Sequence, residues 1–70
     1  MRVGLRCEEC EIAVWLATTR AELHWLLSRV HVVREVRGHL SAGLDTWMDE
    51  GLTFIDAHDG HSVIVVTGGR

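Results

Sequence analysis

Two short metal-binding motifs, one near each end, most constrain what this 70-residue chain can fold into. Cys7 and Cys10 are separated by two residues, and His58 and His61 have the same spacing. Together they offer four ligands, which is the number that a tetrahedral structural zinc ion requires. A chain of this length builds only a small hydrophobic core, so a bound metal can decide whether it folds at all.

The composition predicts one domain, residues 1–70, that associates with other molecules. Hydrophobic residues make up 47% of the chain, and three of the large side chains are tryptophans. One small subunit has difficulty covering that much apolar surface, so we expect a protein partner or a homo-oligomer, in the simplest case a homodimer.

The charge and the first residues of the chain argue against some functional classes. The net charge is −3, which disfavours a nucleic-acid partner. No apolar run is long enough to cross a membrane, and residues 1–6 do not resemble a signal peptide. Two cysteines without a secretory leader indicate a cytoplasmic protein with a reduced thiol pair.

The first third of the sequence predicts a strand, a cysteine turn and a second element. Residues 1–6 favour a short strand that leads into Cys7. Residues 11–17 are rich in β-branched and aromatic types and fit the returning strand of a hairpin, but they could also open a helix. Thr18 or Thr19 is a suitable N-cap for the helix that follows, because Glu22 completes a capping box with Thr19.

The middle of the chain has helical periodicity. An apolar stripe recurs at helical spacing, and it consists of Leu23, Leu26, Leu27, Val30 and Val33. Val32 and Val36 lie outside that stripe, near Trp25, and could form a dimer face. Residues 29–36 contain enough valine to form a strand instead.

A second helix is predicted over about residues 42–58, with Ser41 as its N-cap. Its buried face comprises Leu44, Trp47, Met48, Gly51, Leu52 and Ile55. Its solvent face comprises Asp45, Asp49, Thr53 and Asp56, which we interpret as ordinary surface charge and polarity. Gly60 suits a left-handed helix stop. Residues 61–67 then predict an apolar strand in the centre of a small sheet. The expected fold class is a small α+β domain.

These elements predict that the two motifs meet. Cys7 ends the first strand, and His61 begins the last one. If those strands pair antiparallel, the end of one lies beside the beginning of the other, and all four ligands gather at one edge of the sheet. A zinc ion with four protein ligands has no open coordination position, so we expect a structural site and no enzyme activity.

The two ends of the chain resemble small zinc-ribbon and treble-clef-like proteins. The resemblance lies in the Cys-x-x-Cys knuckle, the helix that ends in residues 54–61, and the apolar strand after it. It implies that Cys7, Cys10, His58 and His61 bind a stabilising zinc ion and that the protein is a binding or scaffolding module. We expect a small interaction module, and a regulatory role is one form that such a function takes. Glu11 stands where a glycine often follows such a knuckle.

Two alternatives use the cysteines alone. Residues 4–10, with Val14 and Ala17 beyond, also resemble the metal loop of heavy-metal-associated domains. That resemblance implies a Cu(I) carrier with a ferredoxin-like fold, in which a helix begins at the cysteine pair. A thiol redox protein is the other alternative, although Glu8 and Glu9 between the cysteines disfavour the reactive thiolate.

A separate histidine set on the first helix has a simpler explanation. His31, Glu35 and His39 follow one another at four-residue steps and could chelate a metal, but a polar stripe that faces water is the simpler explanation, and we favour it.

Overall fold

The structure is a computed structural model that describes residues 2–39 and 43–68. Six elements follow one another in the described residues. They are the strands β1 (Arg2–Cys7) and β2 (Ile12–Leu16), the helices α1 (Arg20–Ser28), α2 (Val30–His39) and α3 (Thr46–Ala57), and the strand β3 (Val63–Gly68). The predicted α+β class is confirmed.

The three strands form an antiparallel sheet in the order β2-β1-β3. The prediction that the last strand is central was therefore wrong: β1 occupies the centre, and β3 is an edge strand. The apolar run in β3 has another cause. Val63 and Val65 face the helices with Val3 and Leu5 of β1, while Ile64 and Val66 point to the other face of the sheet.

The cysteine pair lies in a β-hairpin. β1 and β2 pair from Val3 opposite Leu16 to Cys7 opposite Ile12, so residues 11–17 contain a returning strand and not the start of a helix. The order of elements and the hairpin position of the cysteines both contradict the ferredoxin-like fold that the Cu(I)-carrier resemblance implied.

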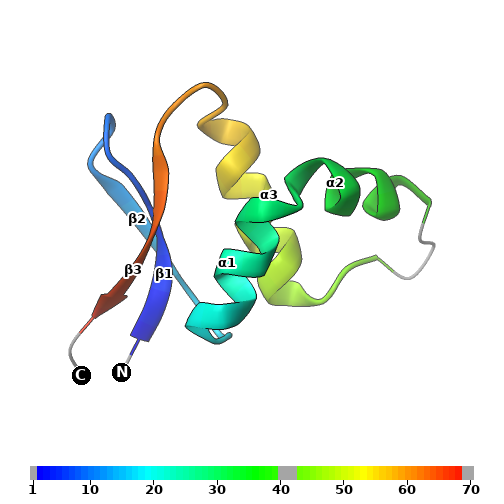
Figure 1. The fold of residues 1–70 in the computed structure, drawn as a ribbon, viewed down its shortest axis with the longest axis horizontal. Coiled ribbons are helices and arrows are strands. Elements are labelled where there is room, and N and C mark those ends of the chain that lie inside the picture. Colours follow the sequence, from blue (N-terminus) through cyan, green and yellow to red (C-terminus); the bar gives the residue numbers. More distant parts are fainter. Residues whose placement is uncertain (1, 40–42, 69–70) are drawn as a thin grey trace.

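The helices lie on one side of the sheet and build the core against it (Figure 1). Leu5 from β1, Leu23 and Leu26 from α1, and Leu52 from α3 are fully buried there. Val3, Leu16 and Val33 complete the cluster of buried residues. In the described part of the chain, no helix is long and apolar enough to cross a membrane.

The first predicted helix is interrupted at Arg29, and the strand that residues 29–36 could have formed is absent there. The Ser28 hydroxyl donates to the Trp25 carbonyl at 2.9 Å, and the Arg29 N–H donates to the Leu26 carbonyl at 3.1 Å, three residues back. Such contacts compete with the regular helical ladder, and the valines that follow have weak helix propensity. The chain turns and starts again as α2. The capping box at the start of α1, Thr19 with Glu22, is confirmed.

The last helix begins later than predicted. α3 starts at Thr46 with Asp45 as its N-cap, while Ser41, the predicted cap, lies outside the described residues. The acidic residues of α3 are surface charges, as predicted, and two of them also pair with α2. Asp56 pairs with Arg34 of α2 and, at 3.5 Å, with Arg37, which also contacts Asp49 at 3.4 Å. These ion pairs join α2 to α3.

Candidate metal centre

The cysteine half of the centre is a tight turn between β1 and β2. Cys7 is the last residue of β1 and is fully buried, and Cys10 is exposed in the turn. The turn closes where the Glu11 N–H donates to the Cys7 carbonyl at 2.9 Å. Glu11 has φ of 56°, in the left-handed region that favours glycine. The position where knuckles often carry glycine therefore adopts a glycine-like conformation here.

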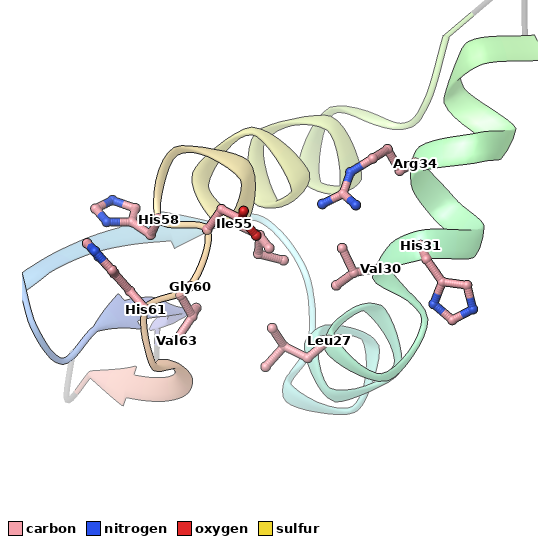
Figure 2. A pocket seen from close by; sticks show the side chains of 10 residues that line it. Leu27, Val30, His31, Arg34, Ile55, His58, Gly60, His61 and Val63 are labelled. Atoms are coloured by element: carbon pink, nitrogen blue, oxygen red, sulfur yellow. The ribbon is translucent and has the colours of Figure 1, made fainter.

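The histidine half is the turn between α3 and β3. His58 is the C-cap of α3, and its N–H donates to the Ile55 carbonyl at 3.1 Å. Gly60 then takes φ of 83°, which confirms the predicted helix stop. The His61 N–H donates back to the His58 carbonyl at 2.9 Å, so the two imidazoles leave the same turn. Figure 2 shows their rings next to each other.

The antiparallel pairing of β1 with β3 brings the two halves together. Cys7 lies opposite Val63, and just beyond it the Glu8 N–H donates to the Ser62 carbonyl at 2.9 Å. As a result, Cys7, Cys10, His58 and His61 each offer one ligand atom, and these atoms all lie within 4.8 Å of one another.

The contacts within the cluster have the dimensions of a coordination shell. His61 Nδ1 lies 3.4 Å from Cys7 Sγ and 3.5 Å from Cys10 Sγ. Tetrahedral zinc with ordinary Zn–S and Zn–N bond lengths separates sulfur from nitrogen by about 3.5 Å. The four residues can therefore hold a metal ion with little movement.

His58 supplies an independent sign that a partner belongs here. Its Nδ1 is buried, and no described residue makes a hydrogen bond to it. The ring of Phe54, one helical turn earlier, lies against it with 4.4 Å between centroids and fixes its orientation. A buried polar atom without a partner is costly, and a metal ion in the cluster can satisfy a ring nitrogen of this residue.

The two thiols are electrostatically different. Burial raises the pKa of Cys7, but hydrogen bonds from the Cys10 backbone, the His61 ring, the Cys10 side chain and the Glu9 backbone together lower it below its usual value. The hydrogen bond with Cys7, together with burial and the negative charges of Cys7 and Glu9, raises the pKa of Cys10. The N–H groups aimed at Cys7 stabilise a thiolate, which is the form that binds metal.

Glu9 is a site residue that the sequence did not reveal. Its carboxylate accepts a hydrogen bond from the Ser62 N–H at 3.2 Å and lies 3.6 Å from His61 Nδ1. It therefore ties the cysteine turn to the histidine turn directly. The only sign of this role in the sequence was the position of Glu9 between the cysteines. A charged residue in a turn is usually just exposed to water.

The remaining sequence candidates lie elsewhere. His31, Glu35 and His39 are all exposed on α2, and within residues 2–39 and 43–68 they are not part of any clustered ligand set. His31 lies across an open pocket of about 400 Å³ from His58 and His61 (Figure 2). Trp25 and Val36, each 42% exposed, lie on the outer surface of α1 and α2.

Comparisons with protein-family models, curated proteins and solved structures gave no match to this chain. The case for a metal centre therefore depends on the geometry of the four residues.

Proposed function

We propose that Cys7, Cys10, His58 and His61 bind one structural zinc ion, and that the protein is a small zinc-stabilised interaction module. The observation that carries this proposal is the convergence of four ligand atoms within 4.8 Å, from two turns that are distant in sequence. Two thiolates and two imidazoles form a donor set typical of structural zinc.

The same donor set argues against catalysis and against metal transport. Four protein ligands complete a tetrahedral shell, so no position remains for a substrate or a reactive water molecule. A Cu(I) carrier needs sulfur ligands that another protein can reach. Cys7 is fully buried, and the imidazoles would have to leave before a partner could approach it.

An interaction role is supported by the apolar side chains that remain on the surface. Six large hydrophobic residues are at least 37% exposed in the described residues. They are Ile12, Trp15, Trp25, Val32, Val36 and Ile64. Exposed apolar surface on a small chain is typical of a protein that associates with a partner or with itself.

Metal analysis of the purified protein tests the proposal. We expect one zinc ion per chain, retained through desalting, and its loss in a His58→Ala/His61→Ala double variant. The matched control is His24→Ala/His31→Ala, which removes two exposed histidines from outside the cluster and should keep the zinc.

Cobalt substitution supplies the coordination geometry. Co²⁺ bound by two thiolates and two nitrogens should give the strong visible absorption of a tetrahedral site. Metal binding that survives the His58→Ala/His61→Ala change would contradict the proposed site and would point to a cysteine-only carrier. A chain without metal whose Cys7 and Cys10 oxidise rapidly and reversibly would support redox chemistry instead.

A further inference from the structure

The free edge of β3 lacks the features that prevent strands from pairing with other molecules. From Ser62 to Gly68 the sequence contains no charged residue and no proline, and five β-branched residues follow one another from Val63 to Thr67. Natural edge strands are usually protected by charges, proline, bulges or a covering element. Figure 1 shows β3 unobstructed, with the helices beside the sheet.

The hydrogen bonds of β3 to β1 determine which backbone groups point outward. Because the Glu8 N–H donates to the Ser62 carbonyl, the backbone of Ser62 is directed at β1. In an antiparallel ladder this direction alternates along the strand. Ile64 and Val66 are therefore bonded to β1, while the N–H and C=O groups of Val63, Val65 and Thr67 point to the free edge.

These outward groups favour one register for a symmetric pair, the register in which all three outward-facing residues of each strand are hydrogen-bonded. When β3 of a second copy approaches antiparallel, only residues with outward groups can bond with each other. Val65 then lies opposite Val65 of the second copy on the two-fold axis, and Val63 lies opposite Thr67. On the outer face of the sheet, Ile64 packs beside Val66 of the second copy, which covers two apolar side chains.

The charges at the two ends of β3 complement each other in this arrangement. Arg2 lies opposite Gly68 in the sheet, and Arg20 lines a pocket with Thr67, so that end is basic. At the other end Glu9 binds the Ser62 N–H, and Asp59 lines a pocket with Val63. The two arginines near this end are already paired with carboxylates, Arg34 with Asp56 and Arg6 with Glu11. An antiparallel pair of β3 strands places the basic end of each copy beside the acidic end of the other.

The other edge of the sheet is less suited to self-association. Glu11 precedes β2, and Asp49 and Glu50 of α3 line a groove with Val14 beside it. Two copies that met through β2 would bring acidic groups together in a chain whose net charge is already −3. Like charges in an interface disfavour association.

We propose that the protein forms a homodimer through β3, which pairs antiparallel with β3 of a second copy to give one continuous six-stranded sheet. The partner of the proposed interaction module is then its own second copy. This inference rests on the proposed function in that the metal-loaded fold presents β3, but its readout is the oligomeric state and not the metal content.

Sedimentation equilibrium of the metal-loaded chain tests the dimer. We expect a concentration-dependent dimer, and the Ile64→Lys variant should weaken it about tenfold, because both symmetric contacts between Ile64 and Val66 of the second copy would lose an apolar partner. The matched control is Val36→Lys, which places the same charge on α2 at a similarly exposed position and should leave the dimer unchanged.

Amide hydrogen exchange supplies a second readout that does not depend on a variant. In the dimer the amide protons of Val63, Val65 and Thr67 should be protected, and they should lose this protection on dilution. Those of Ile64 and Val66 should stay protected in both states.

Two results would overturn the proposed dimer, and each has a different consequence for the rest of the proposal. A chain that stays monomeric at the millimolar concentrations of NMR, while it holds one zinc, would overturn the dimer and leave the zinc proposal standing. A dimer that Val36→Lys disrupts and Ile64→Lys does not would place the interface on the helices and would also overturn the inference.

Discussion

At the scale of single residues, Glu11 shows how the turn around the candidate ligands constrains the backbone. A side chain other than glycine costs about 1–2 kcal/mol in the left-handed conformation. Glu11 adopts it because Cys7 and Cys10 must both face the same point while β2 returns along β1. Its weak ion pair with Arg6, at 4.0 Å and exposed to solvent, offsets little of this cost.

We therefore expect Glu11→Gly to stabilise the metal-loaded protein by about 0.5–1 kcal/mol, which is the relief of strain less the greater flexibility of glycine in the unfolded chain. Urea unfolding measures the change. Glu8→Gly is the matched control, because Glu8 lies in the same turn without a positive φ and should lose stability. Equal effects of the two substitutions would contradict the argument.

Residue chemistry made the four candidate ligands predictable, whereas the residues that position them could not be predicted. Cysteine and histidine at metal-ligand spacing stand out in any sequence. The role of Glu9 depends on the exact approach of Ser62 from the far end of the chain, and the conformation of Glu11 depends on the hairpin. Both arise from tertiary contacts, which spacing does not encode.

At the scale of elements, the start of α1 contains a pH-dependent contact. Hydrogen bonds from the Thr18 side chain and then the Thr19 side chain hold the pKa of Glu22 below its ordinary value of 4.5. Burial opposes this shift, and the hydrogen bond from the Thr19 backbone adds a smaller contribution to it. A carboxyl whose pKa is lowered by folding stabilises the native state when it is ionised. That contribution is complete above about pH 4.5 and is lost as the pH falls through the lowered pKa.

The comparison of wild type with Glu22→Gln isolates this effect. We expect the wild type to be the more stable at neutral pH, and the difference between the two to shrink steadily below pH 4.5. Urea unfolding at a series of pH values measures it. Protonation of the metal ligands affects both proteins equally and cancels in the difference. A difference that stays constant with pH would contradict a charged capping box.

The elements themselves were predictable to different degrees. The capping box and Gly60 mark helix ends by local chemistry, and the structure has both. The break at Arg29 has no glycine or proline to mark it and depends on a serine contact and on packing. The edge position of β3 was hidden because apolar residues at every position are typical of a central strand. In this structure the helices cover one face of β3, and the apolar side chains on its other face remain exposed.

At the scale of the whole molecule, the core is small, and we expect the proposed zinc ion to decide whether the fold persists. Seven buried residues form the central cluster of the described chain. A core of this size supplies only about 3–5 kcal/mol of net stability. Binding of structural zinc is coupled to folding because the unfolded chain has no preformed site.

Removal of the metal with a chelator should therefore unfold most of the protein, and added zinc should restore it. Circular dichroism in the far ultraviolet measures the helix content during both steps. The His58→Ala/His61→Ala variant should resemble the chelated wild type with or without zinc. A chelated protein that melts as cooperatively, and at the same temperature, as the loaded one would show that the core suffices alone.

The position of the candidate metal cluster also predicts at which end the sheet begins to fray. The four candidate ligands lie together where β1 ends, at Cys7, so a bound metal ion would fasten the sheet at that end alone. At the far end, where Arg2 lies opposite Gly68, the strands are held by the backbone ladder, by the packing of Val3 and Leu16 in the core, and by the stacking of Arg2 on Trp15. The sheet would therefore be fixed at one end and free to open from the other. Fraying should begin at Arg2 and run toward the cysteines, so that a protease or a chaperone would first meet loosened chain there, while the opposite end stays closed.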